Sequence, residues 1–199
     1  MDTQRGFERL VNFSDAVVAI AATLLVLPLV DIADPDAGTG TWDLLGEHAA
    51  EIFAFVLSFV VIFRLWLTHH RLFQDVVGYT RPMTWANFLW LLSIVFLPFP
   101  TKLIAEKSGF DPSASSLYVG TILVANLAIC IIALIVARRP ELARPGSDVH
   151  LAETLITSGL MIVALGLSFT VVGLWSIAAL TLTGPIHRIV DLGVARSKR

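Results

Sequence analysis

Long apolar runs alternate with short polar stretches along the whole chain. An α-helix needs roughly 20 mainly apolar residues to cross the hydrocarbon core of a membrane. The runs predict transmembrane helices over 11–30, 45–67, 83–103 and 116–137. The last apolar block is too long for one span, so we divide it into two short spans at 153–167 and 169–184. The pattern therefore predicts that residues 1–199 form one six-span, all-α transmembrane domain.

Prolines stand near the far ends of two predicted spans. Pro28 lies where the first span is about to leave the bilayer, a place where a proline is tolerated. Pro98 and Pro100 are expected to kink the far end of the third span, because proline removes a backbone donor and clashes with the preceding turn.

The composition supports an integral membrane protein. Hydrophobic residues make up 56% of the chain, and the mean hydropathy is +0.78. Charged residues make up only 15%, whereas a soluble domain carries about 25%. The single cysteine, Cys130, cannot form a disulfide within the chain. The first apolar run is too long for a signal peptide, so we expect it to be retained.

The basic residues predict the orientation of the spans. If the N-terminus is cytoplasmic, the inner segments carry twelve of the fourteen Lys and Arg residues, and the outer side keeps only Lys102 and Lys107. The inner ones are Arg5, Arg9, Arg64, Arg71, Arg81, Arg138, Arg139, Arg144, Arg188, Arg196, Lys198 and Arg199. The positive-inside rule then predicts both termini in the cytoplasm, in a multi-pass protein of the cell membrane.

The first apolar run carries the candidate chemistry. Ionisable groups within a span are costly unless they are paired or face water, so Arg9 and Asp15 at its mouth indicate function. On a helix, Ile20, Thr23 and Leu27 share one face, with Leu24 beside them. We interpret this face as the lining of a cation pathway.

The sequence carries no catalytic or cofactor motif. It has no zinc-binding His-Glu-x-x-His, phosphate-binding glycine loop or Gly-x-Ser-x-Gly, and no Thr-Val-Gly-Tyr-Gly potassium filter. It therefore predicts neither an enzyme nor a bound cofactor or metal, and no nucleic-acid partner.

Arg9-x-x-x-Phe13-Ser14-Asp15, followed by Ala-Val-Val-Ala-Ile-Ala-Ala-Thr-Leu-Leu-Val-Leu, resembles the signature of the transmembrane protein 175 family of potassium channels. The close match covers about twenty residues, and span count and length fit over the rest. Bacterial members of that family have one six-helix repeat and assemble as tetramers. The resemblance implies a homotetramer in which four first helices surround a pore for potassium and other monovalent cations.

The resemblance also implies roles for residues of the first helix. Ile20 would form the narrowest hydrophobic ring, with Leu24 or Leu27 adding apolar layers, and the Thr23 hydroxyls would favour potassium over sodium. Such a ring offers no oxygen ligands and gates by wetting and dewetting, so selectivity would be modest. Sequence spacing alone shows only that these residues can share a face, and ordinary packing or lipid contact is the alternative.

The motif residues need partners near the cytoplasmic interface. We expect Ser14 and Asp15 to bond to some of His69, His70, Trp85 and Asn87, which fixes the tilt of the first helix. For His69 and His70, contact with lipid headgroups is the alternative. Trp66, like the other tryptophans, is interpreted as an interfacial anchor or packing residue. Asn126 is expected to form a hydrogen bond between helices.

Two other functions are compatible with the sequence. A secondary transporter or proton-coupled carrier would use Asp15 with His69 and His70 as a relay. It predicts discontinuous helices and a midplane site. A membrane-embedded enzyme would use the same three residues, but it needs a nucleophile or metal-ligand set that the sequence lacks. A modestly potassium-selective channel is the function that the sequence favours.

Overall fold

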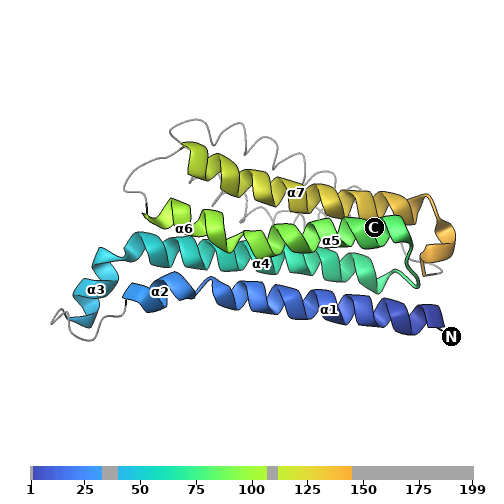
Figure 1. The fold of residues 1–199 in the computed structure, drawn as a ribbon, viewed down its shortest axis with the longest axis horizontal. Helices are drawn as coiled ribbons and strands as arrows, with labels where there is room; N and C mark the ends of the chain where they lie inside the picture. Colours follow the sequence, from blue (N-terminus) through green and yellow to red (C-terminus); the bar gives the residue numbers. More distant parts are fainter. Residues whose placement is uncertain (1, 33–39, 107–111, 145–199) are drawn as a thin grey trace, which may run out of the picture.

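In the described part of the chain, four long helical segments run side by side and alternate in direction (Figure 1). The computed structural model describes residues 2–32, 40–106 and 112–144. Its elements are α1 (Asp2–Leu24), α2 (Leu27–Ile32), α3 (Thr41–Glu47), α4 (Ala49–Gln74), α5 (Arg81–Phe96), α6 (Pro98–Glu106), α7 (Pro112–Ala137) and the 3-10 turn η1 (Pro140–Leu142).

The all-helical membrane class is confirmed. Four segments in the described residues are long and apolar enough to cross a membrane: Arg5–Ile32, Ala49–Gln74, Arg81–Ala105 and Ser113–Ala137. They overlap the first four predicted spans. The second begins at Ala49 and continues to Gln74, well past the predicted end at 67, and the residues before it form the separate helix α3. The predicted spans 153–167 and 169–184 lie outside the described residues.

Prolines divide two of the four segments. Helix α5 ends at Phe96 and α6 begins at Pro98, where the kink was predicted. In the first segment, the break lies earlier than Pro28, between Leu24 and Leu27. The reason is the missing N–H of Pro28, which cannot bond to the Leu24 carbonyl one turn back. The Val26 N–H instead bonds to the Thr23 carbonyl at 3.2 Å, a tighter turn.

One apolar core joins the helices. Helix α5 packs most extensively against α7, and α1 packs against both α4 and α5. Trp90 of α5 is fully buried near the centre. Helix α1 contributes Phe7, Ser14, Val18 and Ala21, and Leu25 follows in the turn after it; all are buried and spaced by three, four or seven residues. This spacing is one stripe of a helix, so α1 turns a single face to the core.

Hydrogen bonds fix the α4–α5 connection at the N-terminal end of the bundle. The Thr80 side chain caps α5 by accepting a bond from the Met83 N–H, and Pro82 lies in the first turn, which suits its fixed backbone angle. The Val77 N–H bonds to the Leu142 carbonyl at 2.9 Å, and the Arg144 N–H bonds to the Asp75 carbonyl at 2.8 Å. These bonds join the loop to the segment that follows α7.

Candidate functional site

The face of α1 opposite the core forms a continuous exposed stripe. On α1 it contains Arg9, Asn12, Phe13, Ala16, Ala19, Ile20, Thr23 and Leu24, and it continues onto α2 with Leu27 and Val30. Ile20 is 59% exposed and Leu27 is 53% exposed. No other element among the described residues covers this stripe, which we call the α1 stripe. Every residue predicted to line the pathway lies on it.

The Thr23 hydroxyl has a defined direction. It donates to the carbonyl of Ile20, with an Oγ1–O distance of 2.7 Å. Its single proton is therefore used within the helix, and its oxygen lone pairs remain as acceptors on the α1 stripe. An oxygen held in this way is suited to a cation. Ile20 and Leu24, on either side, provide no such ligand.

On its buried face, α1 is joined to α4 and α5 by a chain of hydrogen bonds. Ser14 donates to the Leu10 carbonyl, with an Oγ–O distance of 2.9 Å. Because this bond uses the only hydroxyl proton, Ser14 must accept from the amide of Asn87, and Nδ2 lies 2.9 Å from Oγ. The Asn87 carbonyl oxygen then faces His69, where Nε2 lies 2.8 Å away and donates. The two predicted partners His69 and Asn87 thus lie in one directed chain with Ser14.

The imidazole of His69 is fixed by aromatic rings as well. It stacks on Trp90 and Phe73, with ring centroids 4.0 Å and 4.1 Å away. All three polar members of the chain, Ser14, Asn87 and His69, have no exposed surface. Within the described residues, the Nδ1 atom of His69 and the Nε1 atom of Trp90 have no hydrogen-bond partner. The ring is thus held by packing on both faces and by one polar bond.

Asp15 is bound by a residue that the sequence did not indicate. Its carboxylate accepts a hydrogen bond from the indole of Trp66, with an Nε1–Oδ1 distance of 2.8 Å. The same indole stacks on His70, with centroids 5.0 Å apart, and Gln74 bonds to His70. Trp66 was interpreted as an anchor or packing residue, because a tryptophan near the end of a span usually serves as one. No signal in the sequence distinguished it.

Several predicted members lie apart from this network. Trp85 is 71% exposed and contacts Phe88 edge-on, so it does not bond to Ser14 or Asp15. His70 approaches Asp15 only through Trp66. Arg9 and Phe13 are exposed on the α1 stripe. Within residues 2–32, 40–106 and 112–144, Asn126 forms no hydrogen bond to a second helix. Its amide donates to the Ile122 carbonyl of its own helix at 2.9 Å, because a helix offers a carbonyl four residues back.

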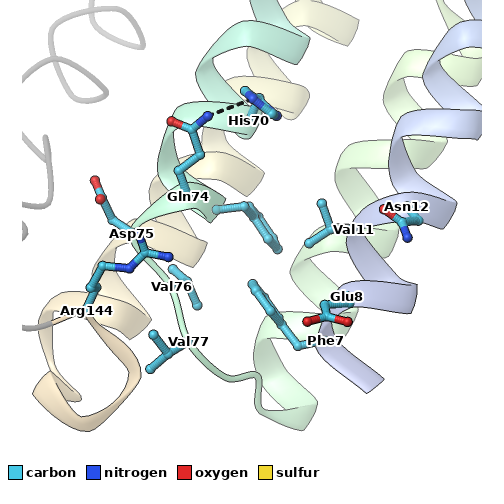
Figure 2. A pocket seen from close by; sticks show the side chains of 11 residues that line it. Phe7, Glu8, Val11, Asn12, His70, Gln74, Asp75, Val76, Val77 and Arg144 are labelled. Carbon is cyan, nitrogen blue, oxygen red and sulfur yellow. Dashed lines mark hydrogen bonds between the residues drawn. The ribbon is translucent and has the colours of Figure 1, made fainter. Parts of the chain in front are cut away.

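A polar hollow opens between the beginning of α1 and the end of α4 (Figure 2). Its volume is about 910 Å³. Glu8 and Asn12 line it from α1, and His70 and Gln74 line it from α4, where the Gln74 amide reaches the His70 ring. Across the described ranges, His, Cys, Asp and Glu residues form no group of three that could hold a metal ion.

Together, the fold and the α1 stripe define a multi-pass helical membrane protein. Its helix α1 forms hydrogen bonds to neighbouring helices on the side facing the core and is exposed on the opposite side. Comparisons with known proteins identify the group. Residues 9–98 match the family described as endosomal/lysosomal potassium channel TMEM175. A potassium channel from Chamaesiphon minutus is 32% identical over 169 residues, covering 81% of this chain and 83% of that protein. The chain belongs to the TMEM175 family, which is a family of ion channels and not of enzymes.

Other relatives are matched over shorter segments. A potassium channel from Streptomyces collinus is 38% identical over 98 residues, which span 49% of this chain and 47% of that protein. A chicken (Gallus gallus) protein named endosomal/lysosomal proton channel TMEM175 is 38% identical over 106 residues, 50% of this chain but 21% of the relative. The match thus spans about half of the bacterial relative's length and a fifth of the animal relative's.

A solved structure agrees over nearly the whole chain. It is the crystal structure of a lysosomal potassium-selective channel TMEM175 homolog from Chamaesiphon minutus. The TM-score is 0.75 at 29% sequence identity, covering 94% of this chain and 98% of that chain. The fold described above is therefore a TMEM175 fold.

Proposed function

We propose that this chain is the subunit of a potassium channel that conducts cations passively through a pore lined by α1. The observation that carries the proposal is the α1 stripe, which runs the length of the helix while the opposite face is fixed by Ser14 and Asp15. The potassium-channel names of the bacterial relatives and the match to a potassium-selective homolog support potassium as the permeant ion.

The pore requires several copies of the chain, because a single stripe cannot enclose a pathway. We propose a homotetramer of six-span subunits with four α1 helices around the axis. An apolar face alone does not distinguish contact with other subunits from contact with lipid, because lipid tails are as apolar as leucine. Asn12 and Thr23 on the same stripe favour a water-lined pathway over lipid contact. Native mass spectrometry of the purified protein tests the assembly, and a monomer or dimer would contradict it.

We propose that Ile20 forms the hydrophobic constriction, with Leu24 and Leu27 as further apolar layers. Thr23 lies within one turn of Ile20 and is the residue of this region that presents a side-chain oxygen. Four such oxygens around an axis can partly replace the hydration shell of an ion, which a ring of isoleucines cannot do. We therefore assign the potassium preference to Thr23.

We assign Ser14, Asp15, His69 and Asn87 to positioning α1, together with Trp66. The bonds of Ser14, His69 and Asn87 are buried and that of Asp15 to Trp66 is half-buried, and all lie off the α1 stripe, so they do not reach an ion in the pathway. Arg9 and Phe13, which belong to the same motif, lie on the exposed face and are assigned to contacts with neighbouring subunits or lipid.

We propose a location in the cell membrane, with the N-terminal end of the bundle in the cytoplasm. The beginnings of α1 and α5 and the ends of α4 and α7 lie together at that end (Figure 1). It carries Arg5, Arg9, Arg71, Arg81, Arg138, Arg139 and Arg144. Lys102, in contrast, lies on α6 at the opposite end. This distribution follows the positive-inside rule.

The test of the function is planar-bilayer recording of the purified protein, with potassium on one side and sodium on the other. We expect discrete currents that reverse toward the potassium equilibrium potential. Currents that follow the proton gradient would instead favour the activity for which the animal relatives are named. Silence from folded, inserted protein over a wide voltage range, with slow counterflow of substrates, would favour a transporter.

A further inference from the structure

A small cavity lies among α4, α6 and α7, at the end of the bundle opposite the N-terminus. Its volume is about 80 Å³. Three hydroxyl side chains line one side, and the other walls are apolar. We call it the hydroxyl pocket. It shares no residue with the α1 stripe or with the Ser14 network, so an inference from it is independent of the proposed function.

The three hydroxyls are Ser58, Thr101 and Tyr118, one from each helix. The Ser58 oxygen lies 2.9 Å from the Thr101 oxygen and 3.1 Å from the Tyr118 oxygen. All three side chains are buried, with Ser58 and Tyr118 each 1% exposed. Thr101 also donates to the Leu97 carbonyl, at an Oγ1–O distance of 2.8 Å.

The directions of these bonds follow from counting protons. Thr101 has one hydroxyl proton and gives it to the Leu97 carbonyl, so it must accept from Ser58. The proton of Ser58 is then used, so Ser58 must accept from Tyr118. Every proton points from Tyr118 toward Leu97. The Tyr118 oxygen keeps its lone pairs, and no donor in the part of the chain that the structure describes bonds to them.

The hydroxyl pocket therefore offers a hydrogen-bond acceptor and no spare donor. A molecule that fits it must donate one proton to Tyr118 and must tolerate apolar walls formed by Ala54, Leu57 and Ile104. Ions and carboxylates are excluded, because burying an unpaired charge is far more costly than burying a hydroxyl.

The volume of the hydroxyl pocket limits the size of the molecule that it can bind. An apolar cavity of about 150 Å³ accommodates benzene, so one about half as large holds a molecule of roughly three to five heavy atoms. Ordered water needs about three polar partners. The apolar walls suit an alkyl chain better than a water cluster.

We propose that the hydroxyl pocket binds a short aliphatic alcohol. Its O–H donates to the Tyr118 oxygen, and its alkyl chain lies against Leu57 and Ile104. Ala50 and Phe53 form the exposed edge of the pocket, and Phe53 is 49% exposed. The molecule enters there from the surrounding membrane, into which short alcohols partition. Bound alcohol bridges α4, α6 and α7 beside the break at Leu97.

The experiment is anomalous diffraction from crystals of the full chain soaked with 2-bromoethanol or with bromoethane. The two molecules are similar in size, and only the first donates a hydrogen bond. We expect a bromine peak in the hydroxyl pocket that reaches half occupancy at a roughly fivefold lower concentration of 2-bromoethanol, the factor expected for one net hydrogen bond. Equal occupancy by both molecules, or only ordered water in the pocket, would overturn the proposal.

Two variants of the pocket lining test whether the bromine peak reports binding in the hydroxyl pocket. Tyr118→Phe combined with Ser58→Ala removes the Tyr118 acceptor and the Ser58 oxygen that would otherwise replace it, and should reduce the preference for 2-bromoethanol. Ala54→Leu fills the pocket and leaves the hydroxyl chain in place, so it should remove the bromine peak for both molecules. A peak that persists at full occupancy in the Ala54→Leu crystals would place the ligand elsewhere and contradict the assignment.

Discussion

The carboxylate of Asp15 accepts a hydrogen bond from the indole N–H of Trp66, although the two residues lie 51 positions apart in the sequence. This bond joins α1 to α4 just beside the place where Ser14 is joined to α5. The buried face of α1 is thus fixed at two neighbouring positions, by two independent helices.

Replacing Trp66 with phenylalanine should destabilise the protein. The ring that stacks on His70 is retained in part, but Asp15 loses its donor. We expect the free energy of unfolding in detergent to fall by about 1.5–3 kcal/mol, the range for a hydrogen bond to a charged group. Trp85→Phe is the matched control, because Trp85 is exposed and does not join the network, and it should change stability by about 0.5 kcal/mol or less. Equal losses in both variants would show that the Asp15 bond contributes nothing.

Asn87 and Asn126 offer a second matched pair. Asn87→Ala leaves His69 without its acceptor and Ser14 without its donor, in a fully buried place. An unsatisfied buried group costs about 1–3 kcal/mol, so we expect a loss within or above this range. Asn126→Ala removes a bond to a carbonyl of its own helix and should cost less. Thermal unfolding of both variants measures the difference, and a larger loss for Asn126→Ala would contradict the positioning role.

Thr23→Val tests the assigned source of the potassium preference. The substitution keeps the shape of the side chain and removes the oxygen from the α1 stripe. We expect the reversal potential with potassium opposite sodium to move toward zero. Thr121→Val is the control, because the Thr121 hydroxyl also donates to a carbonyl of its own helix, Leu117, but lies on α7. A shift in the control and none in Thr23→Val would refute the assignment.

Ile20→Asn tests the constriction. A polar side chain at the narrowest ring lets water enter a region that the isoleucines keep dry. We expect a larger single-channel conductance and weaker discrimination between potassium and sodium. Ile131→Asn places the same change on the exposed face of α7, where Ile131 is 46% exposed, and should leave the conductance unchanged. An unaltered conductance in Ile20→Asn would place the constriction at another residue.

The sequence predicted the class of fold and the location of the four described spans, because apolar runs of roughly 20 residues are typical of helices that cross the hydrocarbon core of a membrane. It also indicated Asn87 and His69 as candidate partners of the motif, because few polar side chains lie near the inner ends of the second and third spans. In these cases one strong local signal carried the prediction.

The sequence failed where the choice depended on tertiary contacts. In the sequence, the same interfacial or packing role is predicted for Trp66, Trp85 and Trp90. In the structure, Trp66 donates to the Asp15 carboxylate, Trp85 is exposed and Trp90 is fully buried. Within the described part of the chain, the amide of Asn126 donates to the Ile122 carbonyl of its own helix, a local bond that competes with one between helices. The break before Leu27 was detectable in principle, because Pro28 removes a backbone bond one turn earlier.

The amide of Asn87 has a consequence for proton movement. The chain from His69 to the Leu10 carbonyl passes through a carboxamide, which does not take up and release protons as an imidazole or a carboxylic acid does. Beside it, the indole of Trp66 is a donor only. A proton that reached His69 or Asp15 would go no further along these bonds. The hydrogen bonds that fix α1 therefore provide no route for proton transfer along its buried face. Any movement of charge along α1 takes place on the opposite side of the helix.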